Sequence, residues 1–231
     1  MRRITRYTGI VAALFAVLLP YSAFAAWSYS QTFDGMTDGD LVGQDSWATN
    51  AFGNSTNFDV QGTTVQAGAK AITIAATAES YIQRDITSTT AGVVSIYIRS
   101  SNLNGPTAEL WVMNGTTYLC IVSINTNAPN AQQPVLAGAS TIDLGTATAN
   151  TWHQFTVELD TSTDQCRAKF DGSSYTSWVN FVSNATVTEI NRIVFAKQNG
   201  NASAVYWDTI ASGDSVAAAT PQPPDFIGLD E

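Results

Sequence analysis

The chain has 231 residues and carries 19 acidic side chains against 10 basic ones, with one histidine and two cysteines. This balance argues against a nucleic acid partner, because binding to phosphates requires clusters of lysine and arginine. A single histidine also excludes a zinc site built from several imidazole rings.

The first 25 residues are predicted to be a signal peptide. Arg2, Arg3 and Arg6 precede an apolar run from Ile10 to Leu19, and small residues follow up to Ala25, where cleavage is expected. This apolar run is about ten residues long, whereas a helix that spans a bilayer needs about twenty. We therefore expect the segment to be cleaved and not to remain as an anchor, and we predict no membrane partner after cleavage. Cleavage leaves seven basic and nineteen acidic side chains, a net charge of −12, and we expect a secreted protein, extracellular or periplasmic.

The rest of the chain is predicted to be all-β. Short apolar runs alternate with Asn, Gly, Ser and Thr clusters that are typical of turns, and none of the runs has a helical period. Uniform composition predicts one domain over residues 26–213, followed by a flexible, proline-bearing tail over residues 214–231. The main predicted strands are Ala71 to Ala76, Ser80 to Ile86, Val93 to Arg99, Ala108 to Met113, Tyr118 to Ile124, Gln133 to Leu136, Trp152 to Leu159, Gln165 to Phe170, Ile190 to Ala196 and Ser203 to Ile210.

Alternation along the strands assigns their two faces. Val94, Ile96 and Ile98 share one side of their strand, whereas Tyr97 and Arg99 share the other, and several other strands alternate in the same way. Each strand therefore has a dry side and a wet side. Two antiparallel sheets packed face to face, each burying one face in a shared core, require this pattern.

Two strings near opposite ends of the domain, Phe33-Asp34-Gly35 and Tyr206-Trp207-Asp208, place an Asp beside bulky residues that favour strands. They are predicted to lie in the first and last strands, which pair and close the domain. Pairing makes Asp34 and Asp208 neighbours, so the two carboxylates are a candidate calcium site. The alternative role for each is to accept backbone hydrogen bonds at a strand end.

The same strings resemble a known family. Phe33-Asp34-Gly35, running on to Trp47, is similar to the opening of secreted bacterial concanavalin A-like domains of the LamG type. The Trp152-led strand with its hairpin ending at Asp171-Gly172 resembles the middle of such domains, and residues 206–210 resemble their closing strand. The resemblance implies an antiparallel two-sheet jelly-roll sandwich. Such domains bind sugars, proteins or calcium, or serve as spacers, so the fold alone does not choose a function.

A glycosidase motif is incomplete in this chain. Glucanases of this fold carry Glu-x-Asp-x-Glu, or a variant with one more spacer, along one strand face, and the outer two carboxylates act as nucleophile and acid/base. Glu158-Leu159-Asp160 matches the first part, but Ser162 and Thr163 stand where the second Glu should fall. We therefore assign no catalytic residue and predict a solvated strand end that runs into a turn.

Four residues form the candidate ligand site: Tyr97, Arg99, Glu109 and Trp111. The alternation places a phenol and an indole on the non-core face of successive strands. Aromatic planes bind the apolar faces of sugars, and nearby polar groups fix their orientation. The alternative is that this face packs under a loop. Tyr97 and Arg99 also leave a lyase open, although nothing in the sequence ties the only histidine, His153, to them.

Cys120 and Cys166 both lie in apolar strand patterns. An oxidising compartment allows one disulfide between them, and two buried free thiols are an equal alternative.

These observations predict an exported, non-catalytic binding module for carbohydrate or adhesion. Two alternatives stay open: a purely structural or protein-interaction domain of a surface protein, and a polysaccharide lyase or glycoside hydrolase. The candidate partners are a glycan or polysaccharide, a surface protein and Ca²⁺.

Overall fold

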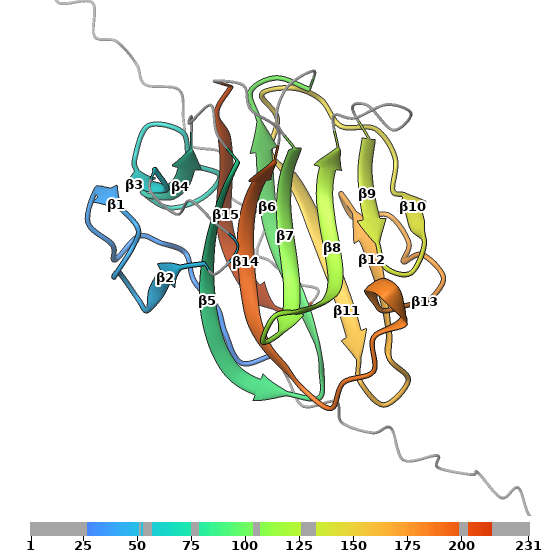
Figure 1. The fold of residues 1–231 in the computed structure, drawn as a ribbon. Coiled ribbons are helices and arrows are strands. Elements are labelled where there is room, and N and C mark those ends of the chain that lie inside the picture. The colour runs from blue at the N-terminus through green and yellow to red at the C-terminus, as the bar shows by residue number, and fades with distance from the viewer. Residues whose placement is uncertain are drawn as a thin grey trace, which may run out of the picture.

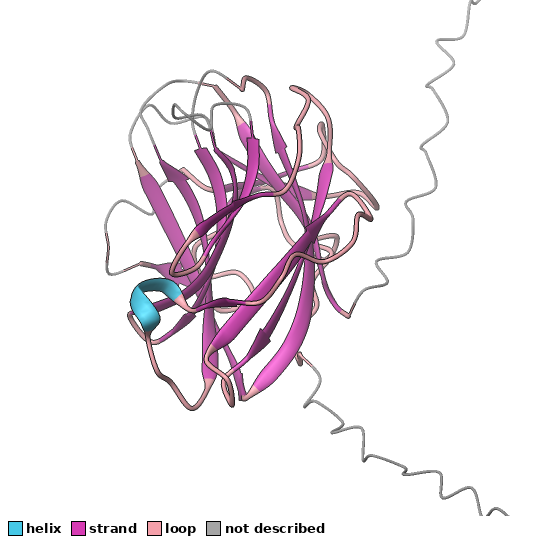
Figure 2. Cartoon of the chain, turned by 90° about the vertical axis from the view of Figure 1, so that its right-hand side faces the viewer, coloured by secondary structure: helices cyan, strands magenta, loops and turns pink. Residues whose placement is uncertain are grey.

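The computed structural model describes residues 27–50, 52, 57–74, 79–103, 107–125, 133–198 and 203–213. The predicted signal peptide and the predicted tail lie outside these residues. Within them, the chain forms two antiparallel sheets that pack face to face, with one short 3-10 helix, η1 (Val182–Asn184), beside them (Figures 1 and 2).

The described strands divide into an eight-stranded and a seven-stranded sheet. In spatial order, the eight-stranded sheet contains β1 (Gly39–Asp40), β3 (Asp59–Gln61), β4 (Ala71–Ile74), β15 (Val205–Ser212), β6 (Ala91–Ser100), β11 (His153–Asp160), β12 (Gln165–Phe170) and β13 (Val179–Asn180). The seven-stranded sheet contains β10 (Thr141–Asp143), β9 (Gln133–Ala137), β8 (Thr117–Asn125), β7 (Thr107–Asn114), β14 (Ile190–Gln198), β5 (Ser80–Thr89) and β2 (Trp47–Thr49).

The predicted all-β, two-sheet architecture is confirmed. Each of the ten predicted strands corresponds to an observed strand, although the end of the one predicted over residues 71–76 lies outside the described residues. The shortest strands, such as β1 and β13, were not predicted because two residues are too few to show an alternation. In the part of the chain that is described, no helix has the length and apolar character needed to cross a membrane.

The core lies between the sheets and is built from the predicted dry faces. Val94, Ile96 and Ile98 of β6 are completely buried there. A stack of aromatic rings joins the two sheets, because Phe195 of β14 lies 4.6 Å from Trp47 and 5.2 Å from Trp207 of β15 between ring centroids. Trp207 is therefore a core residue, as its sequence context predicts.

The two ends of the domain meet, as predicted, but Phe33-Asp34-Gly35 lies in a turn rather than in the first strand, and the last strand, β15, lies between β4 and β6. Gln31 and Ile210 form a bridge in which each backbone N–H donates to the other residue's carbonyl oxygen at 2.8 Å. This contact brings Asp34 and Asp208 to the same region of the eight-stranded sheet.

One outer sheet face departs from the predicted polar side. Trp111 and Met113 of β7, with Val194 and Ala196 of β14, form a second buried apolar cluster apart from the core. Both strands lie in the middle of the seven-stranded sheet, so side chains from strands on either side cover them. Alternation identifies which residues point outward, but it does not show that neighbouring strands bury them.

Candidate functional site

The structure separates the four residues of the predicted ligand site into two pairs. Tyr97 and Arg99 lie on β6 in the eight-stranded sheet, whereas Glu109 and Trp111 lie on β7 in the seven-stranded sheet. All four occupy outward positions, but the two outer faces look away from each other (Figure 2). The prediction of one shared surface is therefore wrong, because the chain crosses from one sheet to the other between β6 and β7.

The pair on the eight-stranded sheet makes structural contacts. The guanidinium of Arg99 lies 4.9 Å from the ring centroid of Tyr206 and donates a hydrogen bond to Oδ1 of Asn150 at 3.1 Å. Tyr97 is half-buried, and burial, followed by the charge of Asp171, raises the pKa of its phenol. These contacts fit packing on the sheet surface.

His153 also has a structural environment. Its Nδ1 lies 2.7 Å from a carboxylate oxygen of Asp171, its Nε2 accepts from the N–H of Thr148 at 2.9 Å, and its ring stacks on Phe170. The side chain is 4% exposed. The structure thus places His153 as a buried residue at the start of β11, as expected for an ordinary strand histidine.

The incomplete glycosidase motif lies at the end of β11, on the eight-stranded sheet. Glu158 forms an ion pair with Arg167 at 2.6 Å. Asp160 accepts a hydrogen bond from the N–H of Ser162 at 2.8 Å, within the turn that follows the strand. The predicted strand end running into a turn is confirmed.

The candidate calcium pair holds a loop. Oδ1 of Asp34 accepts hydrogen bonds from the N–H groups of residues 69 and 70 at 2.6 and 3.0 Å. Oδ2 of Asp208 accepts from those of residues 66 and 67 at 2.7 and 3.2 Å. Both carboxylates therefore fill the alternative role of backbone acceptors. Among the described residues, no three His, Cys, Asp or Glu side chains gather as a metal site would require.

Cys120 of β8 and Cys166 of β12 are free thiols in this structure, and both are buried. They belong to opposite sheets and meet across the core, where Cys166 contributes to the raised pKa of Cys120. Burial is the main reason that the pKa of the Cys120 thiol is raised well above its usual value.

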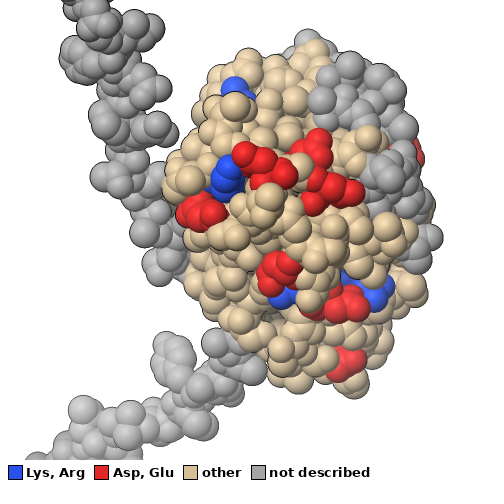
Figure 3. Space-filling model, turned by 90° about the vertical axis from the view of Figure 1, so that its left-hand side faces the viewer, with Lys and Arg blue, Asp and Glu red and all other residues tan. Residues whose placement is uncertain are grey.

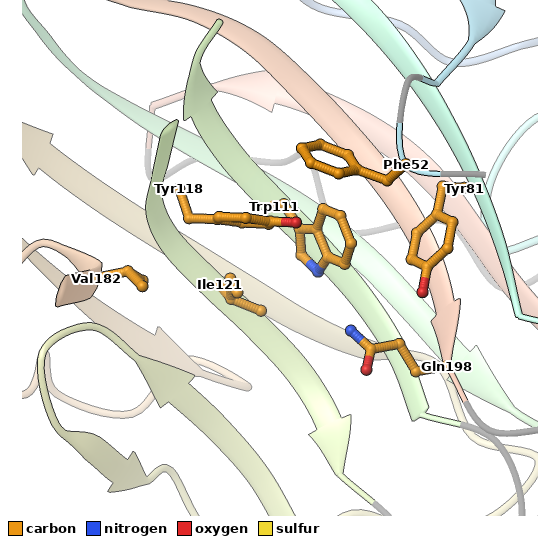
Figure 4. Close-up of a pocket in the computed structure, with 7 residues that line it drawn as sticks. All are labelled: Phe52, Tyr81, Trp111, Tyr118, Ile121, Val182 and Gln198. Atoms are coloured by element: carbon orange, nitrogen blue, oxygen red, sulfur yellow. The ribbon is translucent and has the colours of Figure 1, made fainter. Parts of the chain in front are cut away.

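An aromatic pocket of about 490 Å³ lies on the outer face of the seven-stranded sheet (Figure 4). Side chains from β5, β7, β8, β14, η1 and the segment after β2 meet there. They are Phe52, Tyr81, Trp111, Tyr118, Ile121, Val182 and Gln198. We call this the aromatic pocket.

Trp111 is the base of the aromatic pocket. The ring centroids of Tyr81 and Tyr118 each lie 5.1 Å from the Trp111 ring, and that of Phe52 lies 6.1 Å away. Trp111 is only 3% exposed, whereas Phe52 is 38% exposed and both tyrosines are half-buried. The prediction that Trp111 itself presents a binding plane is corrected: it supports the three rings that face the pocket.

Glu109 lies beside the pocket and holds two of its side chains. Its Oε2 accepts hydrogen bonds from Nε1 of Trp111 and, at 2.9 Å, from Nε2 of Gln198. In Figure 4 the indole nitrogen points toward Gln198. Burial raises the pKa of Glu109 to about 7, the two hydrogen bonds lower it by less, and the charge of Glu79 adds to the rise. At neutral pH this carboxyl group exists in both protonation states.

Sequence reasoning missed the other lining residues. Tyr81 and Tyr118 occupy outward positions in their strands, which alternation can show. Their meeting with Trp111 depends on β5 and β8 lying on the two sides of the β14 and β7 pair. No local pattern specifies that order, because strands far apart in sequence form it.

No family model matches the chain, and no curated protein matches it. Solved structures match the fold. A sialidase matches 81% of this chain with a TM-score of 0.61 and 10% identity, but this chain spans only 18% of the sialidase. The Bacillus licheniformis β-glucanase matches over 81% of this chain and 98% of its own, with a TM-score of 0.51 and 11% identity.

A third match is the carbohydrate recognition domain of Emp46p in its metal-free form. It covers 82% of this chain and 97% of its own, with a TM-score of 0.52 and 10% identity. Identities this low show the fold alone. Together with the two antiparallel sheets, they define the chain as a concanavalin A-like sandwich, which confirms the predicted fold class.

Proposed function

We propose that this protein is an exported, non-catalytic carbohydrate-binding module whose ligand site is the aromatic pocket. One observation carries the proposal: three accessible rings surround a buried tryptophan, with the side-chain amide of Gln198 beside them. Aromatic faces bind the C–H faces of sugar rings, and a small number of polar groups then fix the orientation of the sugar.

The shape of the pocket supports this proposal. The Tyr81 and Tyr118 rings are inclined at 41° and 68° to the Trp111 ring, so they form walls around it. The volume of about 490 Å³ falls within the range of roughly 300–1,000 Å³ that is usual for small-molecule sites. A pocket of this kind accommodates a sugar unit with rings on more than one side.

The comparisons support a sugar ligand. The fold is shared with a β-glucanase and with a carbohydrate recognition domain, and both names refer to carbohydrates. Export is part of the proposal because residues 1–25 have the order of basic, apolar and small residues found in signal peptides. The module would then meet polysaccharides or cell-surface glycans outside the cytoplasm.

The experiment is a glycan array probed with the purified protein and two variants. Tyr118→Ala removes a pocket wall, whereas Tyr97→Ala removes a half-buried tyrosine from the outer face of the other sheet and is the matched control. We expect wild type and Tyr97→Ala to bind the same glycans and Tyr118→Ala to bind them about tenfold more weakly. Circular dichroism verifies that both variants fold.

Two results would contradict the proposal. Failure of the wild type to bind any glycan would favour a structural or protein-interaction domain. Equal losses in the two tyrosine variants would show that the sugar site is not the aromatic pocket.

Glycoside hydrolysis is the second candidate function. A glycosidase needs one carboxyl group that stays protonated near neutral pH and a second that is ionised. The raised pKa of Glu109, with Glu79 near enough to contribute to it, favours this candidate. Binding is the first proposal because Glu109 is only 7% exposed and already accepts two hydrogen bonds. Release of reducing ends from β-glucans, abolished in Glu109→Gln, would establish hydrolysis instead.

A further inference from the structure

We propose that the aromatic pocket selects uncharged sugar units and rejects units that carry a carboxylate or a sulfate. This inference rests on the proposed function and names the class of ligand. It follows from where the charged side chains of the described residues lie relative to the pocket.

The basic residues of the domain lie away from the pocket. Seven basic residues follow the predicted signal peptide. Four of them lie on or next to the eight-stranded sheet: Lys70, Arg99, Arg167 and Lys169. A fifth, Arg84, occupies an interior-facing position on β5 of the seven-stranded sheet. Several of them pair with acidic groups, and Figure 3 shows basic side chains beside acidic ones on the side of the molecule that carries β1 to β4.

The remaining two basic residues lie on β14. Lys197 is opposite Ala108 and Ser80, which are both buried, so its position belongs to the interior face. Arg192 is on the outer face, but its Nε pairs with Asp85 at 2.6 Å and its Nη1 donates to the carbonyl oxygen of residue 115 at 2.9 Å. Within the described chain, Arg192 is thus the single cation of this face, and two of its three nitrogens already have partners.

Apart from the predicted signal peptide, which contains Arg2, Arg3 and Arg6, the segments outside the described residues contain no further cation. The internal gaps at residues 51, 53–56, 75–78, 104–106, 126–132 and 199–202 contain no Lys, Arg or His, and neither does the segment 214–231. An anionic sugar therefore finds no guanidinium or ammonium group to bind its charge, which carboxylate and sulfate recognition normally uses.

Acidic groups, in contrast, share the outer face with the pocket. Glu109 lies directly beside it, and Glu79 accepts a hydrogen bond from the hydroxyl group of Tyr81 at 3.0 Å. Asp85 and Asp143 occupy outward positions on the same sheet. Their combined field repels an anion.

Uncharged hydroxyl groups have an acceptor available in the same place. Gln198 donates through Nε2 to Glu109, and its Oε1 accepts no hydrogen bond from the described residues. A sugar hydroxyl group can donate to this oxygen of Gln198, whereas a carboxylate cannot.

The test uses matched pairs of polymers. β-1,3-glucan, β-1,4-glucan, α-1,4-glucan, galactan and mannan are each immobilised beside the same polymer oxidised at C6 to the uronate, and binding is measured at low salt. We expect the neutral form to bind at least about tenfold more tightly, and added salt to reduce the difference. Equal or tighter binding to an oxidised form overturns this inference and leaves the proposed function standing. Binding to none of the ten polymers overturns both.

Two variants test the role of charge directly. At pH 8, where Glu109 is ionised, Glu109→Gln removes a negative charge beside the pocket, and Asp59→Asn removes one from an exposed position on β3 as the matched control. Val182→Lys adds a cation at the rim and keeps the test valid if Glu109→Gln fails to fold. The ratio of the affinity for the neutral polymer to that for the oxidised polymer should fall several-fold in Glu109→Gln or Val182→Lys. Asp59→Asn should leave this ratio unchanged. An unchanged preference in both folded pocket variants contradicts the inference.

Discussion

The indole Nε1 of Trp111 donates a hydrogen bond to the buried carboxyl group of Glu109, two residues earlier on the same strand face. Gln198 donates to the same oxygen from the neighbouring strand. The base of the aromatic pocket is thus oriented by one ionisable group that the rings and the sheet keep from water. The stability of the domain should therefore depend on the ionisation of Glu109.

Glu109 should make the domain less stable as the pH rises. The folded state raises the pKa of this carboxyl group from 4.5 to about 7, so between these values the folded chain keeps a proton that the unfolded chain has lost. The free energy of unfolding therefore falls as the pH rises from 4.5 to 7, by about 3 kcal/mol for this group, and levels off above that. In Glu109→Gln this contribution is absent. Urea denaturation at several pH values measures the difference between the two proteins, and a constant difference would contradict the expectation.

Removal of the Asp208 carboxylate should loosen the loop of residues 62–70. Two N–H groups of this loop lose their acceptor in Asp208→Ala, which should lower the free energy of unfolding by about 2 kcal/mol. Proteolytic cleavage within the loop should also become faster. The control Asp59→Asn changes an exposed side chain and should leave both measurements unchanged. Slower or unchanged cleavage in Asp208→Ala would show that another contact holds the loop.

Calcium should leave the unfolding temperature unchanged. Backbone N–H groups already engage one oxygen of each carboxylate, and no third acidic side chain of the described residues joins Asp34 and Asp208 as a further calcium ligand. A ligand that binds only the folded state raises the unfolding temperature, so differential scanning fluorimetry with millimolar calcium or with EDTA is a direct check. A rise with calcium that disappears in Asp34→Ala would restore the calcium site predicted from the sequence.

Oxidation should link Cys120 to Cys166. The thiols meet between the two sheets, so oxidised glutathione can accept the two electrons and two protons that the pair loses when the sulfur–sulfur bond forms. The bond closes a loop of nearly fifty residues and should add about 4 kcal/mol to the free energy of unfolding on the entropy model. Intact mass and urea denaturation with and without reductant measure both effects. Cys166→Ala should show neither, and two titratable thiols in the oxidised, denatured wild type would refute the link.

Local patterns predicted the fold because strands have a period of two. Val94, Ile96 and Ile98 are fully buried as their alternation indicates, and Trp207 lies in the core. The domain ends also meet at Gln31 and Ile210, although Phe33-Asp34-Gly35 forms a turn rather than the predicted strand. The buried faces could be predicted because alternation depends on residues close together in the chain.

The site was predicted only in part. Trp111 lines the aromatic pocket and Glu109 lies beside it, as their outward positions suggest, but Tyr97 and Arg99 lie on the other sheet. Alternation shows on which side of a strand a residue lies. It does not show which sheet the strand joins. The partners of Trp111 on β5 and β8 became visible only when the order of the strands was known.

The amino-acid sequence by itself determined the all-β class, the faces that form the core, and the scarcity of basic residues. The tertiary structure decided which strands became neighbours, and with them the residues that surround Trp111 and the meeting of Cys120 with Cys166. The physical reason is that side-chain alternation and charge are properties of short segments. Strand order, in contrast, results from contacts between segments that are distant in the chain, and it is stable only when both sheets bury their faces together.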